Sequence, residues 1–155
     1  MFSATGASAQ LFAFLKKAEE NNQAQLTAYN DGFGTWTIGY GSIYNWDENR
    51  PVAEGDTIDQ ATADRWLQIE ATQDLSEVKK LVTVPISQNA LVALSSFAYN
   101  EGLSALKEST LLKLLNSGAD VNVVSDEFDR WVYAAGVKVP GLVNRRNAEK
   151  QLFLS

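Results

Sequence analysis

The spacing of apolar residues predicts a chain built mainly from amphipathic helices. Over residues 9–20 the apolar side chains recur at the i, i+3, i+4, i+7 spacing of one helix face. A longer helix is predicted over residues 60–80, with Asp59 as its N-cap. Its buried stripe consists of Ala63, Leu67, Ala71, Leu75 and Val78. Residues 88–99 are apolar on most faces, as in a central buried helix. Further helices are expected over residues 104–116, 121–135 and 140–153.

Residues 28–42 have a different pattern, which is typical of a tight hairpin. Asp31, Gly32 and Gly34 supply a chain reversal, because glycine reaches positive φ without penalty and aspartate tolerates it. The β-branched and aromatic residues 35–40 then predict a short strand. One or two more short strands are expected within residues 43–56. The predicted fold class is α+β and mainly helical: a small β-hairpin lobe (residues 9–58), a long connecting helix (59–80) and a helical lobe (81–155), in one domain of 155 residues.

Composition narrows the chemistry that is available. The chain has no cysteine and no histidine, which excludes thiolate and Ser-His-Asp catalysis and leaves carboxylates, hydroxyls and basic groups. The acids are scattered without ligand spacing, so no metal site is predicted. A net charge of −6 and a pI near 4.6 argue against nucleic-acid binding. Neither a signal peptide nor an apolar run of roughly 20 residues is recognisable, so we expect no integral membrane segment.

Two neighbouring acids end the first predicted helix, and their positions on it differ. Glu19 lies four residues after Leu15, at the edge of the apolar face. Glu20 lies four residues after Lys16, where a surface ion pair is the obvious interpretation. We therefore expect Glu19 to be the partly desolvated carboxyl, because desolvation raises a carboxyl pKa as a general acid requires.

The hairpin offers a second candidate group. Asp31 at its mouth and a hydroxyl six residues later, that of Thr37, could hold a water molecule between them. The alternative is that Asp31 merely initiates the turn. Tyr40 stands between two glycines, which suits a backbone that another molecule approaches closely.

Several motifs, in this order, resemble the phage lysozymes of glycoside hydrolase family 24, especially the endolysins of lambdoid phages. They are the acid that follows L-K-K-A, the stretch A-Y-N-D-G-F-G-T-W-T-I-G-Y-G, and then S-F-A-Y-N-E-G (residues 96–102), S-T-L-L (109–112) and G-L-V-N-R-R-N-A-E (141–149). The resemblance runs from about Leu11 to the C-terminus. It implies a two-lobed lysozyme-like fold.

The resemblance also implies a reaction. A member of this family hydrolyses the β-1,4 bond between N-acetylmuramic acid and N-acetylglucosamine in peptidoglycan, without a cofactor. Carried over by motif, Glu19 is the general acid, and Asp31 and Thr37 hold the water that attacks with inversion. Tyr40, Asn100, Ser109 and Arg146 match positions in or near the glycan groove. The resemblance further implies a monomer that stays in the host cytoplasm until a holin, a separate membrane-breaching protein, gives access to the wall.

The late basic residues allow two interpretations. From Arg130 onward five basic residues accompany one acid, Glu149, and could face an anionic wall. We expect Arg146 to contact the glycan and Arg145 to serve the surface or an internal ion pair. Alternatively both arginines complement the last helix, Asn100 ends a helix, and Ser109 satisfies local backbone groups.

The chain departs from the family pattern at three points. The usual Glu-to-Asp spacing falls on Asn22, so Glu19 implies an insertion in the connector. Ser42 replaces a histidine that usually supports the strand, and the acidic pI is unusual for a wall hydrolase. A catalytically impaired glycan-binding or virion-associated protein is therefore the main alternative, and chitin is an alternative substrate.

Overall fold

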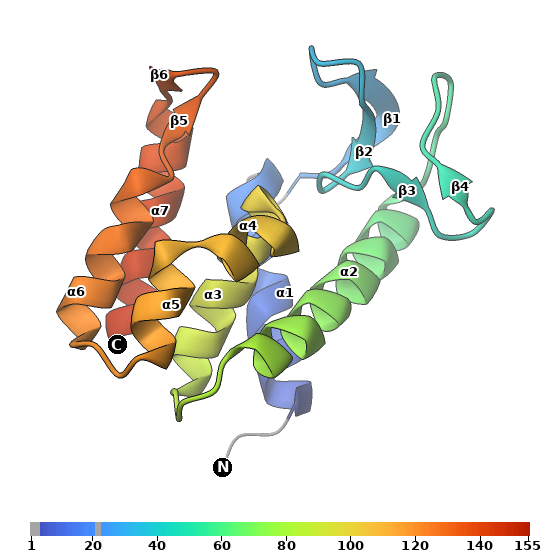
Figure 1. Cartoon of the computed structure of the whole chain (residues 1–155). Coiled ribbons are helices and arrows are strands. Elements are labelled where there is room, and N and C mark those ends of the chain that lie inside the picture. Colours follow the sequence, from blue (N-terminus) through green and yellow to red (C-terminus); the bar gives the residue numbers. More distant parts are fainter. Residues whose placement is uncertain (1–3, 21–22) are drawn as a thin grey trace. The chain divides into compact units, whose positions relative to one another are not determined.

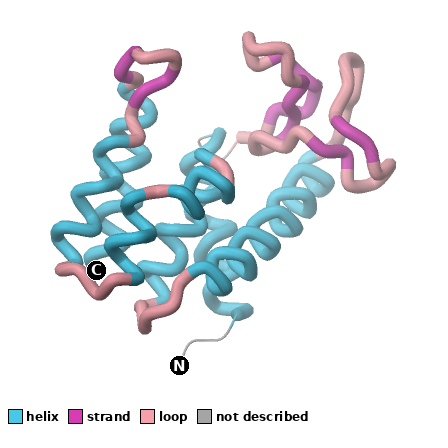
Figure 2. Tube along the Cα trace, viewed as in Figure 1, coloured by secondary structure: helices cyan, strands magenta, loops and turns pink. Residues whose placement is uncertain are grey.

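In the computed structural model, which describes residues 4–20 and 23–155, helices dominate and the strands form small hairpins (Figures 1 and 2). In chain order the elements are α1 (Ala4–Glu20), β1 (Gln25–Asn30), β2 (Trp36–Gly39), β3 (Tyr44–Asn45), β4 (Arg50–Pro51), α2 (Gln60–Leu81), α3 (Gln88–Glu101), α4 (Leu103–Glu108), α5 (Thr110–Asn116), α6 (Val121–Asp126), the 3-10 helix η1 (Glu127–Arg130), β5 (Tyr133–Ala134), β6 (Val137–Lys138) and α7 (Pro140–Leu154). The predicted α+β, mainly helical class is confirmed.

The chain divides into two compact units. The hairpin unit is residues Phe12–Ala71, and the helical unit combines Met1–Leu11 with Thr72–Ser155. Helices α1 and α2 each contribute residues to both units. The helical unit is therefore assembled from the two ends of the chain.

The hairpin unit contains the predicted strand in an antiparallel pair. In this pair of β1 and β2, Tyr29 lies opposite Thr37. A second antiparallel pair joins β3 and β4 within the predicted segment 43–56. Ile38, Val52 and Trp66 form a small core between these strands and α2.

Helix α2 begins and packs as its sequence predicts. The Asp59 carboxylate accepts a hydrogen bond from the Thr62 backbone N–H at 2.8 Å, which satisfies one orphan donor of the first turn. All five residues of the predicted stripe are buried. Because this pattern is local and regular, the helix could be predicted almost to the residue.

In the helical unit, α3 is the most buried helix and packs against α7 (Figure 1). Phe97 of α3 makes edge contacts with Phe128 and Trp131, and Phe128 also contacts Phe153 of α7. The prediction of a central apolar helix over residues 88–99 is confirmed. These aromatic contacts connect α3, η1 and α7.

Two predicted helices are wrong in extent. Residues 104–116 form two helices because Ser109 is extended (φ −72°, ψ 150°) and its side chain caps the second. Residues 121–135 stop being α-helical at Asp126 and end in the β5–β6 hairpin. Ala135 and Gly136 both have positive φ, 51° and 79°, as a two-residue hairpin turn requires. Gly136 thus marks a hairpin rather than the end of a helix.

Candidate active site

The turn between β1 and β2 is held by two side chains that precede it. Asn30 Oδ1 accepts hydrogen bonds from the N–H groups of Gly32 at 2.9 Å and Gly34 at 3.3 Å. Asp31 Oδ1 accepts from Phe33 N at 2.7 Å and Thr35 N at 3.1 Å. Short polar side chains that bond to the backbone two residues onward stabilise a reversal. Asp31 therefore does initiate the turn, as the alternative interpretation expected.

Asp31 and Thr37 are also joined through one residue, Thr35. The Thr35 carbonyl accepts from the Asp31 N–H at 3.0 Å and from the Thr37 hydroxyl at 3.5 Å, while the Thr35 N–H donates to Asp31 Oδ1. Asp31 is exposed and Thr37 is buried. The structure thus brings these two predicted site residues to one end of the hairpin.

Glu19 lies in the last turn of α1 and belongs to the same hairpin unit as Asp31 and Thr37. Its side chain is half-buried, and Leu15, one turn earlier, is fully buried. This matches the expected edge of the apolar face. The Glu20 side chain and residues 21–22, including Asn22, lie outside the described residues.

Tyr40 does not reach the surface of the described structure. Its side chain has no exposed area, and its hydroxyl accepts a hydrogen bond from Gln60 at 2.7 Å. Burial raises the pKa of this phenol. The Lys16 ammonium lies 5.9 Å from the ring centroid. The expectation that Tyr40 contacts the glycan is therefore corrected to a role in supporting β2 against α1 and α2.

Ser42, which stands in place of the family's histidine, forms a hydrogen bond with Glu70 of α2. The Ser42 hydroxyl donates to Glu70 Oε1 at 3.0 Å, and the Trp46 indole N–H donates to Oε2 at 2.9 Å. Tyr44 packs edge-on against Trp46. Ser42 thus still supports the segment after β2, through a carboxylate that sequence reasoning did not single out.

Arg145 and Arg146 lie in a buried charged cluster of the helical unit. Glu149 has no exposed area, and its carboxylate contacts both guanidinium groups and accepts from the Ser96 hydroxyl at 2.6 Å. Burial raises the pKa of the Glu149 carboxyl, although the guanidinium groups counteract the rise. Arg146 is itself fully buried. The expectation that Arg146 touches the glycan is corrected: it serves an internal ion pair, as Arg145 does.

Asn100 and Ser109, the other two predicted groove residues, lie in the same helical unit. Asn100 is half-buried in the last turn of α3 and accepts a hydrogen bond from Arg146. Ser109 is buried, where its hydroxyl donates to the Leu106 carbonyl at 2.7 Å and accepts from Leu112 N at 3.0 Å. Ser109 is accordingly occupied with backbone, as its alternative interpretation expected.

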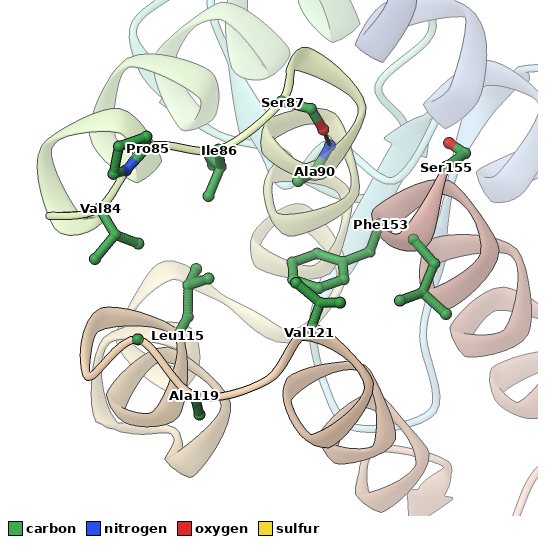
Figure 3. A pocket seen from close by; sticks show the side chains of 12 residues that line it. Val84, Pro85, Ile86, Ser87, Ala90, Leu115, Ala119, Val121, Phe153 and Ser155 are labelled. Carbon is green, nitrogen blue, oxygen red and sulfur yellow. Dashed lines mark hydrogen bonds between the residues drawn. The ribbon is translucent and has the colours of Figure 1, made fainter.

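The helical unit also has an apolar pocket of about 410 Å³ (Figure 3). It is lined by Val84, Pro85, Ile86, Ser87, Ala90, Leu115, Gly118, Ala119, Val121, Phe153, Leu154 and Ser155. None of the predicted site residues lines it. The pocket therefore has no connection with the candidate carboxylates.

Among the residues that the structure describes, no helix is both long and apolar enough to cross a membrane. Nor do these residues contain a group of three or more His, Cys, Asp or Glu side chains that could hold a metal ion.

Comparison with known proteins shows to which protein family the chain belongs. A sequence model described as phage lysozyme matches residues 19–149, most of the chain. The chain belongs to the phage lysozyme family. It is 38% identical over 135 residues to an endolysin of Acyrthosiphon pisum secondary endosymbiont phage 1, covering 84% of this chain and 88% of the relative. It is 37% identical to the endolysin of Salmonella phage P22, covering 90% of this chain and 92% of the relative.

A solved structure supports the same family. The endolysin from Escherichia coli O157:H7 phage FAHEc1 superposes with a TM-score of 0.80 at 32% identity, covering 94% of this chain and 91% of that one. The chain is accordingly a lysozyme, a glycoside hydrolase of the bacterial cell wall, and it has a lysozyme-like fold.

Proposed function

We propose that this lysozyme hydrolyses the β-1,4 bond between N-acetylmuramic acid and N-acetylglucosamine with Glu19 as general acid. Asp31 and Thr37 hold and orient the attacking water. A glycosidase needs one carboxyl to protonate the leaving oxygen and a second to activate water or attack the sugar. All three residues belong to the hairpin unit.

This assignment rests on one observation: Asp31 and Thr37 both form hydrogen bonds with Thr35. Asp31 Oδ1 is engaged by two backbone N–H groups, and within the described residues Oδ2 has no hydrogen-bond partner. The Thr37 hydroxyl gives its proton to the Thr35 carbonyl, so its lone pairs can accept from a water. The Asp31 carboxylate and the Thr37 hydroxyl are both hydrogen-bonded to Thr35, and each keeps an oxygen that can orient a water rather than attack the sugar.

The proposed roles imply inversion at the anomeric carbon. An inverting pair leaves room for the water, with its carboxyl groups roughly 6.5–9.5 Å apart. An NMR time course on a soluble glycan fragment should show the inverted anomer first. First formation of the retained anomer would make Asp31 a nucleophile.

The test of the acid is Glu19→Gln, which keeps the side-chain shape and removes the proton. We expect loss of turbidity clearing on chloroform-treated Gram-negative cells with thermal unfolding nearly unchanged. Glu20→Gln is the matched control and should retain activity, since the i,i+4 pair with Lys16 that the sequence spacing predicts would contribute only about 0.2–0.5 kcal/mol. Loss in the control alone would move the acid to Glu20. An inactive native chain would instead favour the impaired, glycan-binding alternative.

We further propose that the chain acts as a monomer and reaches the wall through a separate holin. The similarity to phage endolysins supports action on the wall of the host cell. Expression in a bacterial host, with and without a pore-forming protein, tests the route. Lysis that depends on the pore supports it, and lysis by the chain alone contradicts it.

A further inference from the structure

The turn between β1 and β2 (Figure 1) carries an exposed aromatic side chain, that of Phe33. Phe33 is 80% exposed, and every other exposed large hydrophobic side chain in the described part of the chain is 66% exposed or less. Its ring has no aromatic or cationic partner among the described residues. An apolar side chain gains free energy when it leaves water, and Phe33 does not obtain this gain in the folded chain.

The turn does not need this ring in order to form. It is held by backbone N–H groups that donate to the side chains of Asn30 and Asp31. Gly32 and Gly34, on either side of Phe33, both have a φ of +89°, and no described atom beyond their chain neighbours lies within 4 Å of where a Cβ would stand. Their role is therefore to permit the left-handed backbone. The structure fixes the backbone of Phe33 and leaves its side chain in solvent.

Phe33 is also attached directly to the candidate active site. Its backbone N–H donates to Asp31 Oδ1 at 2.7 Å. Because an N–Cα bond is about 1.46 Å long, the Phe33 Cα lies within about 4.2 Å of that oxygen. The other oxygen of the same carboxylate is the one proposed to hold the attacking water. A sugar that meets this water is therefore within reach of the Phe33 ring.

The charge beside Phe33 indicates what its ring would contact. Insertion into a membrane or an apolar protein surface would draw the Asp31 carboxylate out of water, and this charge has no ion-pair partner among the described residues, so the cost would be high. The net charge of −6 disfavours a nucleic-acid base. A β-1,4-linked sugar suits both groups, because its hydroxyls lie around the rim of the ring and its faces carry C–H groups. The C–H groups can cover an aromatic face while the hydroxyls keep the carboxylate in a polar environment.

We propose that the Phe33 ring stacks against the C–H face of a sugar in the bound glycan, beside the water held by Asp31. The ring binds the sugar and takes no part in bond cleavage. The inference rests on the proposed function, because it adds one contact with the same substrate. Phe33 lies within the D-G-F-G stretch of the motif but was not among the predicted site residues.

The test measures the affinity for an N-acetylglucosamine oligosaccharide in the Glu19→Gln chain, which should leave the glycan intact. Adding Phe33→Ala should raise Kd about five- to tenfold, equal to about 1–1.4 kcal/mol, because the apolar contact is lost. Phe33→Trp keeps an aromatic face and should stay within twofold of the Phe33 chain. Phe33→Leu keeps an apolar side chain without that face and should bind as weakly as Phe33→Ala. Unchanged affinity in Phe33→Ala, or full affinity in Phe33→Leu, would overturn the stacking.

Two controls separate the contact from folding and from loss of apolar surface. The turn bonds come from the backbone of residues 32–35, so Phe33→Ala should keep the Tm of its parent. Val123→Ala removes another exposed apolar side chain, on α6 in the helical unit, and should leave Kd unchanged. An equal rise in Kd in Val123→Ala would show that the effect is not specific to Phe33 and would overturn the proposal.

A second measurement keeps the contact separate from catalysis. The NMR signals of the Phe33 ring should shift when the oligosaccharide is added at millimolar concentration. If the native chain does not lyse walls while these signals shift, the proposed function fails and the contact stands. Unmoved Phe33 ring signals in a chain that lyses walls overturn the contact alone. Flotation with phosphatidylethanolamine–phosphatidylglycerol vesicles that is lost in Phe33→Ala would assign the ring to a membrane and also overturn it.

Discussion

At the scale of single residues, Asp31 combines an observed structural task with a proposed chemical one. Its Oδ1 closes the β1–β2 turn through two backbone N–H groups, and its Oδ2 is left for the proposed water. The sequence presented these as alternatives, a turn-initiating residue or a water-holding one. The structure allows both, because a carboxylate has two oxygens and the turn uses one.

The two tasks can be separated by substitution. Asp31→Asn keeps an oxygen for Phe33 N and Thr35 N, so we expect stability near that of the native chain and activity at least about 100-fold lower. Asp31→Ala removes both bonds and should also cost about 1 kcal/mol of unfolding free energy in urea titrations. Native activity in Asp31→Asn would mean that Asp31 only stabilises the turn and takes no part in catalysis.

Arg146 shows where residue-level prediction stops. The motif correctly singled out the arginine pair, and Glu149 lies three and four residues away on the same helix, so an ion pair could have been read from spacing. The burial of Arg146 could not be predicted from this spacing. Asn100 and Glu101 are 45 and more residues distant in sequence and reach Arg146 only through the packing of α3 against α7.

At the scale of elements, Ser109 decides where one helix ends and the next begins. It caps α5 and bonds to the last turn of α4. Ser109→Ala should therefore lower the unfolding free energy by about 1 kcal/mol, the usual value of an N-cap, with KM unchanged. Urea titration measures the unfolding free energy, and wall-lysis kinetics measure KM. Asp at the same position should retain part of the cap, and a raised KM without destabilisation would restore Ser109 to the groove.

In the segment from β4 to α2, Arg50 forms an ion pair with Asp56, and it also pairs with Glu48 just before β4. Arg50 and the Ala53 N–H hold the pKa of the Asp56 carboxyl below its ordinary value. A lowered pKa in the folded state adds stability above the unfolded pKa of about 4, and this is lost as pH falls through the folded value. Asp56→Asn should thus lower Tm by about 2–4 °C at pH 7, with a smaller difference below pH 3.8. A difference that persists undiminished at pH 2 would assign the effect to packing.

Local regularity explains which elements the sequence predicted. Helix α2 has an N-cap and an unbroken apolar stripe, and both were found in the structure. The segment 121–135 has helix-compatible residues, but its hairpin requires positive φ at Ala135, which alanine rarely adopts. The helix and strand propensities of alanine therefore give no sign of the positive φ at Ala135. Its conformation comes from the strands on either side of the turn.

At the scale of the whole molecule, the late basic residues do not form an unpaired positive face. Four of the five are ion-paired with acids: Arg130 with Glu127, Lys150 with Asp126 and Asp129, and Arg145 and Arg146 with Glu149. The net charge of −6 is therefore not offset there by a docking patch. The expectation of a basic surface that faces an anionic wall is revised accordingly.

This charge distribution predicts an unusual response to salt. Repulsion between the protein and an anionic wall is screened as the Debye length falls, so lysis should accelerate about two- to fivefold between about 10 mM and 150 mM salt. Initial rates of turbidity loss on purified walls measure this directly. A soluble, uncharged oligosaccharide should show no such dependence. Slower lysis of walls with added salt would indicate that an attractive basic surface exists elsewhere.

The assembly of the helical unit from both chain ends has a consequence during synthesis on the ribosome. The hairpin unit, with all three proposed catalytic side chains, is complete once residue 71 has been translated, but the helical unit awaits residues as late as 155. Arg146, which donates a hydrogen bond to Asn100, emerges 46 residues after it. A nascent chain therefore carries its proposed acid and its proposed water-holding pair before α7 is available to pack against α3.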